Sequence, residues 1–220
     1  DIYLRKISAS DVQLDFGDRF SGLITLVPGH RGLRSVSSRL EAEKLAALAS
    51  EQGSILDADD IANEHRGRLK ESLKSLRGKC DLVIIDTPPD LGFEMTTALI
   101  ASDWFIIPVF PSGYDLKGLE TLARTVEKVR KRYNPGLRLA GVLLGNFDKT
   151  AKLDSDIHKM LVRKFNEELV FRTTIGRSVK HREATLYRKT IFEHAPGDAA
   201  SVQYLDLVKA GNSAQAIKAL

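Results

Sequence analysis

The sequence contains a single cysteine, Cys80, and therefore cannot form an internal disulfide. No stretch approaches the roughly 18 consecutive apolar residues that a membrane-spanning helix needs. The first residues also lack the apolar core of a signal peptide. These absences predict a soluble, cytoplasmic protein without a membrane partner. They also favour Cys80 as a small core residue rather than a nucleophile.

The histidines are few and scattered, and their positions lack the spacing of a zinc site. What the chain does have is 220 residues with 43% hydrophobic content. This is enough to bury a sizeable core, and we expect one α/β domain over residues 1–220.

Helical and strand patterns alternate along the chain, which predicts parallel pairing with right-handed crossovers. We therefore expect an α/β fold with a doubly wound, mostly parallel sheet flanked by helices. Pro108 should end one of its strands. The patterns predict strands near 22–29, 82–85, 104–107 and 139–144, and helices near 69–76, 95–101, 119–133, 157–165 and 200–210.

The apolar run 82–85 carries the most information, because it delivers the carboxylate of Asp86 into a turn that contains Pro88 and Pro89. A strand that is apolar on both faces is typical of a parallel sheet covered by helices. Ligands of such sheets lie beyond the carboxyl ends of the strands. Asp86 could there hold Mg²⁺ beside a nucleotide, or it could simply cap the turn.

Charge is unevenly distributed along the chain. The formal net charge is +4, but residues 159–189 contain nine Lys or Arg and only three acids, a local balance of +6. A basic segment in a molecule that is otherwise slightly acidic suggests an anionic partner such as duplex DNA. The alternative is a solvated surface.

Four segments in order resemble the ParA/MinD family of deviant Walker A ATPases, and the ParA-type partition proteins in particular. Residues 86–92 (DTPPDLG) are similar to the Walker B and switch II segment. Residues 107–111 (IPVFP) with 116–119 (LKGL) resemble the strand, loop and helix that follow, and 141–148 (GVLLGNFD) resembles the strand that ends near the adenine. Residues 175–184 (IGRSVKHREA) resemble a basic segment of the family, with Gly176 where that segment usually has proline.

The resemblance implies a P-loop ATPase that binds ATP and Mg²⁺ as a homodimer and binds DNA without sequence preference. Hydrolysis would be stimulated by a ParB-like centromere-binding protein, in chromosome or plasmid segregation on the nucleoid. It implies that Asp86 binds the metal and, with Thr87, serves catalysis, while Pro88 and Pro89 restrict the loop. The base contacts would be Asn146, Phe147 and Asp148, and the DNA contacts Arg163, Lys164, Arg177, Lys180 and Arg182.

For Asn146 the alternative is a turn-capping role, since asparagine favours turns. For Thr87, Pro88 and Pro89 the alternative is an ordinary rigid strand exit.

The family's glycine-rich phosphate loop is missing, because no stretch matches G-x-x-x-x-G-K-[ST]. We expect the sequence to be an N-terminally incomplete piece of a longer polypeptide, and the chain without this loop to hydrolyse ATP poorly or not at all. The alternatives are a non-catalytic DNA- or protein-binding module of the same fold and a MinD-like membrane ATPase. The tail 211–220 is too weakly apolar to favour the membrane alternative.

Overall fold

The computed structural model describes residues 9–15, 19, 24–27, 38, 42–43, 45–46, 55–111 and 116–213. The chain divides into two compact units. The first comprises residues 1–103 and 121–136, and the second comprises residues 104–120 and 137–220. Whether they act as the single domain expected from the sequence stays a prediction. Among the described residues, no helix is both long and apolar enough to cross a bilayer.

The first unit is largely helical. Its elements are η2 (Ala9–Val12), the short antiparallel strands β1 (Leu14–Asp15) and β2 (Thr25–Leu26), α2 (Ile55–Leu73), η5 (Lys74–Leu76), α3 (Phe93–Ala101) and most of α4 (Leu116–Arg132). Helix α2 packs against α3. Leu40, Leu45 and Leu48 also predict an amphipathic helix from the sequence, and most of that segment lies outside the described residues.

The end of α4 is fixed to its neighbours within this unit by two side chains. The amide of buried Asn134 donates to the carbonyls of Leu99, Ile100 and Ser102 at 2.7–3.3 Å. It thereby satisfies carbonyls that the last turn of α3 leaves without helical partners. Tyr133 accepts a hydrogen bond from the Arg66 guanidinium at 3.1 Å, and that guanidinium lies over its ring.

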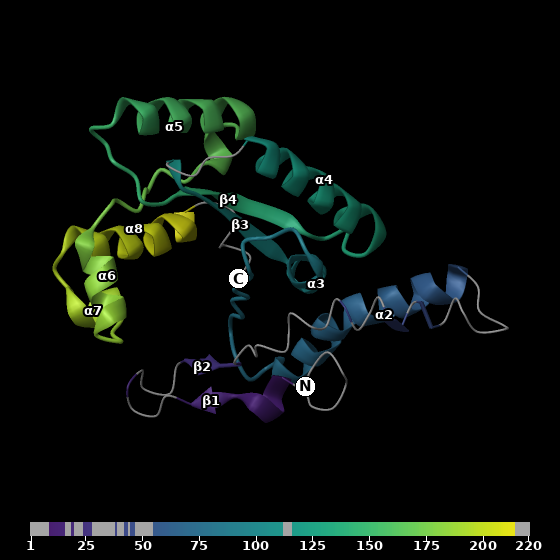
Figure 1. Cartoon of the computed structure of the whole chain (residues 1–220). Helices are drawn as coiled ribbons and strands as arrows, with labels where there is room; N and C mark the ends of the chain where they lie inside the picture. Colours follow the sequence, from purple (N-terminus) through teal and green to yellow (C-terminus); the bar gives the residue numbers. More distant parts are fainter. Residues whose placement is uncertain are drawn as a thin grey trace. The chain divides into compact units, whose positions relative to one another are not determined.

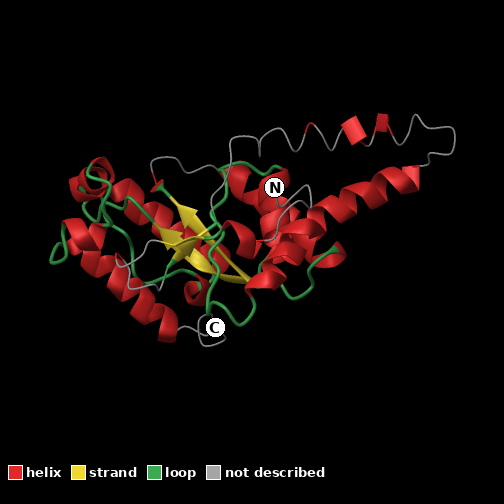
Figure 2. Ribbon diagram, turned by 90° about the horizontal axis from the view of Figure 1, so that it is seen from below, coloured by secondary structure: helices red, strands yellow, loops and turns green. Residues whose placement is uncertain are grey.

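The second unit contains the parallel pair β3 (Trp104–Val109) and β4 (Arg138–Leu144), which lie side by side in yellow in Figure 2. In Figure 1, α5 (Lys152–Phe165) lies above these strands, and α6 (Val179–Leu186), α7 (Ile191–His194) and α8 (Ala199–Ser213) lie below them. A 3₁₀ turn, η7 (Glu167–Leu169), follows α5. The parallel pairing and the flanking helices confirm the α/β prediction.

The carboxyl half of β4 is largely buried. Val142 and Leu144 are fully inaccessible, and Ile157 and Leu161 of α5 are buried as well. After α5, the chain returns beside β4 through parallel bridges between Val142 and Val170 and between Phe147 and Gly176. This burial explains why 139–144 reads as an almost continuous apolar run.

The expected buried strand at 82–85 is wrong for this structure. The segment has no strand pairing, and Leu82, Val83 and Ile84 are exposed, Ile84 to 83%. A strand is stabilised by a neighbour that accepts and donates its backbone hydrogen bonds, and no described strand pairs with this run. Cys80 at its start is also exposed rather than in the core.

Pro108 does not end its strand either. Strand β3 continues through Pro108 to Val109, with Pro108 opposite Leu143. In the described sheet β3 pairs only with β4. Proline lacks a backbone N–H and is tolerated on such an edge strand, where one side of the backbone has no sheet partner.

Candidate functional site

A cavity of about 660 Å³ lies in the second unit, where β3 and β4 end. Clefts of this size are typical of small-molecule sites, and the carboxyl ends of parallel strands are where α/β sheets bind ligands. Its lining comes from the ends of both strands, the segment 175–182 and one residue of α8. These residues are Pro108, Phe110, Leu143, Gly145, Asn146, Ile175, Gly176, Arg177, Ser178, Val179, His181, Arg182 and Tyr204.

Backbone hydrogen bonds bring these distant segments to one end of the sheet. The N–H of Ile175 donates to the carbonyl of Leu144 at 2.8 Å, and the N–H of Phe147 donates to the carbonyl of Ile175 at 3.0 Å. The N–H of Arg177 then donates to the carbonyl of Phe147 at 3.1 Å. Residues 175–177 therefore run alongside the end of β4 and place the Arg177 backbone at the cavity.

Gly145, directly after β4, lies close to the Phe110 ring. A Cβ added to Gly145 would lie 2.6 Å from Cε1 of Phe110, closer than real Cβ contacts. Phe110 itself is 54% exposed and lines the cavity. Phe110, His181 and Tyr204 were not predicted as site residues. The position of Phe110 directly after the strand 104–109 is the one signal in the sequence that could have found it.

Asn146 lines the cavity and is exposed. Its φ of 51° lies in the left-handed region, which asparagine tolerates better than most residues. The backbone conformation fits the turn role weighed for this residue, and its place in the cavity fits the base contact. One asparagine can serve both roles, because the turn uses its backbone and the ligand would use its amide.

Phe147 and Asp148 do not line the cavity. The Phe147 ring lies edge-on to His158, with centroids 6.4 Å apart. Oδ1 of Asp148 accepts hydrogen bonds from the backbone N–H and the hydroxyl of Thr150, at 2.9 and 2.7 Å. These bonds are the main reason that the pKa of Asp148 lies below its usual value. The base contacts proposed for both residues stay predictions.

Asp154 stabilises the same turn and was missed by the sequence reasoning. It is buried, and its Oδ2 accepts from the Asp148 N–H at 2.7 Å. The sequence feature that could have pointed to Asp154 is its position in the first turn of α5, where negative charge is favoured.

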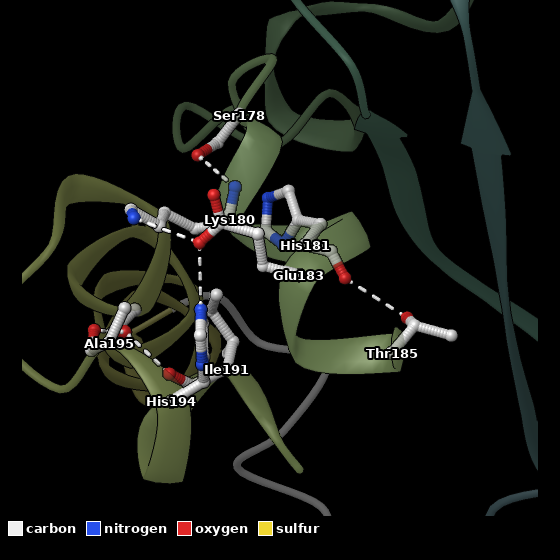
Figure 3. A network of polar contacts seen from close by, with 9 residues as sticks. Ser178, Lys180, His181, Glu183, Thr185, Ile191, His194 and Ala195 are labelled. Atoms are coloured by element: carbon white, nitrogen blue, oxygen red, sulfur yellow. Dashed lines mark hydrogen bonds and ion pairs between the residues drawn. The ribbon is translucent and has the colours of Figure 1, made fainter. Parts of the chain in front are cut away.

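The basic segment divides between two environments. Arg177 and Arg182 are exposed and line the cavity, whereas Nζ of Lys180 forms a 2.9 Å ion pair with Glu183. His194 approaches the same carboxylate oxygen at 2.9 Å, as Figure 3 shows. The Lys180 contact chiefly lowers the pKa of Glu183, and the Glu183 contact raises the pKa of Lys180.

The remaining predicted DNA contacts lie elsewhere in this unit. Arg163 and Lys164 are exposed in the last turn of α5 and do not line the cavity. The structure therefore joins Asn146 with Arg177 and Arg182, which had been assigned to separate base and DNA sites. The DNA contacts of all five cations stay predictions.

The predicted metal-binding segment belongs to the first unit. Asp86, Pro88 and Pro89 are exposed and Thr87 is half-buried. Just beyond them, Asp90 accepts from the N–H of Gly92 at 2.8 Å, at the start of α3. An exposed carboxylate fits Mg²⁺, which is bound through one or two carboxylates together with substrate phosphates.

Comparison with known proteins identifies the family. A model of the AAA domain matches residues 23–139, more than half of the chain. A ParA family protein of Chlamydia pneumoniae is 31% identical over 199 residues, which cover 87% of this chain and 76% of that protein. The chain belongs to the ParA/MinD family of P-loop ATPases.

Two further relatives carry functional names. The sporulation initiation inhibitor protein Soj of Bacillus subtilis is 38% identical over 142 residues, covering 64% of this chain and 56% of Soj. The chromosome-partitioning ATPase Soj of Thermus thermophilus is 37% identical over 129 residues, covering 59% of this chain and 51% of that protein. The chain thus spans about half the length of both Soj relatives.

Among solved structures, cobyrinic acid a,c-diamide synthase from Mycobacterium smegmatis with bound ADP and magnesium superimposes with a TM-score of 0.63. The two sequences are 26% identical, and the superposition covers 85% of this chain and 66% of the synthase chain. This likeness agrees with an α/β sheet flanked by helices in the P-loop NTPase manner, and it shows that nucleotide and Mg²⁺ bind within this fold.

Proposed function

We propose that this protein acts as a ParA-like partition ATPase in chromosome or plasmid segregation. It binds ATP as a dimer, holds nonspecific DNA in that state, and releases it when a ParB-like centromere-binding partner stimulates hydrolysis. The observation that carries the proposal is the cavity at the carboxyl ends of β3 and β4, lined by Asn146, Arg177 and Arg182, in a chain of this family. In this role the protein is cytoplasmic and associated with the nucleoid.

The cavity suits a nucleotide base. Phe110, Leu143 and Val179 give it apolar walls, and the Asn146 amide can donate to and accept from a heteroaromatic ring. Phe147 and Asp148 support the turn that holds Asn146, and we keep them as residues of the base site.

The phosphates and the metal depend on the segment around Asp86. Asp86 holds Mg²⁺, directly or through water, and Thr87 gives its hydroxyl to the metal-bound water or the γ-phosphate. Pro88 and Pro89 restrict the loop that responds to that phosphate. The exposure of Asp86 is consistent with this role.

The DNA surface consists of exposed or half-buried cations on α5 and α6 and in the segment before α6: Arg163, Lys164, Arg177, Lys180 and Arg182. If about four phosphates are contacted, affinity falls about a hundredfold between about 50 and 200 mM salt. Titration of nonspecific duplex at several salt concentrations measures this slope. A flat response would exclude a surface dominated by phosphate contacts.

The decisive experiment is MgATP and DNA binding by the full-length protein with Asn146→Asp. Aspartate tolerates the left-handed backbone at this position and keeps the side-chain shape, but it loses the amide donor. We expect ATP affinity to fall about tenfold and ATP-dependent DNA binding to fall with it. Asn166→Asp is the matched control, because Asn166 has a similar φ of 67° but does not line the cavity. Equal ATP affinities of the two variants would refute the base site.

We further infer that the 220-residue chain alone hydrolyses ATP poorly, because its sequence has no phosphate loop to hold the triphosphate. The ATPase rate of the 220-residue chain, measured beside that of a ParA-type ATPase with an intact phosphate loop, tests this. The same absence favours the second candidate function, a non-catalytic DNA- or protein-binding module. Binding of DNA by the full-length protein that is indifferent to ATP would support the module over the ATPase.

A further inference from the structure

Helix α4 carries cations at every fourth residue of one face. Arg124, Lys128 and Arg132 are all exposed (α4 is labelled in Figure 1). At 3.6 residues per turn, these positions share a narrow stripe along the helix. Val126, on the opposite face of the helix, is half-buried. We call Arg124, Lys128 and Arg132 the α4 stripe.

Glu127, the acid within the span of the α4 stripe, is already engaged. Oε1 of Glu127 forms a 2.6 Å ion pair with Lys131, and this contact lowers the pKa of Glu127. In the part of the chain that the structure describes, no residue of the α4 stripe forms an ion pair. The three positive charges therefore follow one another along one face of the helix, and Glu127, the acid between Arg124 and Lys128 in the sequence, pairs with Lys131 instead.

Helix stability alone does not explain this arrangement. Cations in the last turn of a helix interact favourably with its dipole, which accounts for Arg132. Arg124 and Lys128 precede the last turn, and like charges spaced by four residues destabilise a helix. An anionic partner would relieve this repulsion.

We propose that the α4 stripe binds the phosphates of duplex DNA, as a contact separate from the cations of α5, α6 and the segment before α6. The inference rests on the DNA binding proposed above. From Arg124 to Arg132 the helix rises about 12 Å, a length over which a duplex presents about seven phosphates. A straight row of cations is complementary to such a linear polyanion.

An anionic membrane fits the α4 stripe less well. Helices that lie on membranes bury an apolar face in the lipid while their cations contact the headgroups. On this part of α4 the apolar residues Leu122, Val126 and Val129 are half-buried or buried. The helix therefore offers lipid a charged surface without an apolar one.

The test is a salt titration of nonspecific duplex binding by the full-length protein with ATP. The variant combines Arg124→Gln, Lys128→Gln and Arg132→Gln. Each lost phosphate contact reduces the log–log slope by about 0.9, so the slope should become shallower by about 2.7. Between about 50 and 200 mM salt, the factor by which the variant loses affinity should then be about fortyfold smaller than the factor for the wild type.

A control variant removes the same charge from exposed cations elsewhere: Arg77→Gln, Lys79→Gln and Lys149→Gln. Its slope should equal that of the wild type. A second variant, Arg124→Lys with Arg132→Lys, keeps the charges and should restore the wild-type slope. Circular dichroism confirms that each variant is folded.

Each outcome decides the proposal. If the α4 stripe variant keeps the wild-type slope, or changes no more than the control, the α4 stripe does not contact DNA, and the proposed function is unaffected. If the wild type binds no DNA with ATP, both proposals fail. If the variant keeps its DNA slope but loses binding to vesicles containing anionic phosphatidylglycerol, the partner is a membrane and the DNA proposal is overturned.

Discussion

Two apolar runs of this chain have nearly the same pattern but different structures. Strand β4 ends two residues before Asn146, and the run 82–85 ends directly before Asp86. Strand β4 pairs with β3 and is bridged on to Val170, which buries Leu144 completely. The run 82–85 has no strand partner, and Ile84 is 83% exposed. The comparison teaches that an apolar run becomes a buried strand only where the fold supplies its neighbours.

The largest expected effect comes from truncating the same kind of side chain in both runs. Leu144→Ala should lower the free energy of unfolding by about 2–5 kcal/mol, because it leaves a cavity in a packed core. Ile84→Ala should change it by less than about 0.5 kcal/mol, since its side chain is mostly in water. Urea denaturation measures both. Similar losses would mean that 82–85 is buried in solution and would break the comparison.

Alanine substitutions at two glycines should change stability in opposite directions. Gly141→Ala places a Cβ 2.7 Å from Cε2 of Phe171 and should destabilise the fold by about 1–3 kcal/mol. Gly67→Ala in α2 meets nothing within 4 Å and should stabilise that helix by up to about 1 kcal/mol. Thermal melts compare the two variants. A stabilising Gly141→Ala would show that β4 packs more loosely than the structure indicates.

A smaller effect is expected at the start of α6, which helps to form the cavity. The Ser178 hydroxyl accepts from the N–H of Lys180 at 3.1 Å and caps the helix. Ser178→Ala should lower stability by about 1 kcal/mol, and Ser178→Thr should restore most of it. If alanine and threonine behave alike in urea denaturation, the cap contributes nothing.

The smallest expected effect is on the pH dependence of stability, to which the Glu183 carboxylate shown in Figure 3 contributes. The Lys180 and His194 contacts lower the folded-state pKa of Glu183 below its usual 4.5. A carboxyl group whose pKa is lower in the folded state stabilises the fold at pH values above its unfolded-state pKa. This stability is lost as the pH falls through the folded-state pKa. The wild type should therefore lose stability more steeply below about pH 4.5 than Glu183→Gln does. Parallel urea curves at each pH for the two proteins would rule out this contribution.

Much of the fold followed from periodicity. The apolar stripes of α3, α4, α5 and α8 and the run of β4 each predicted an observed element, and the alternation of helices and strands predicted parallel pairing. The structure differs from the prediction where pairing with a neighbouring strand determines whether a segment is a strand. The run 82–85 has no partner strand among the described residues, and β3, paired with β4, continues through Pro108.

Some residues that line the cavity could be selected from the sequence, but their arrangement could not. Asn146 and Arg177 were both selected, yet their meeting in one cavity depends on residues 170–177 running beside β4. No local pattern marks that pairing. The contact of Lys180 with Glu183 and the turn bond of Asp154 likewise depend on side-chain geometry that spacing alone does not determine.

The central claim is that the cavity at the ends of β3 and β4 receives the nucleotide base. Titrating isotope-labelled full-length protein with MgATP, and following backbone amide shifts by NMR, tests it most directly. The account predicts shifts at Gly145, Asn146 and Arg177, together with Asp86 and Thr87. Shifts at Asp86 and Thr87 with none at the cavity residues would contradict it.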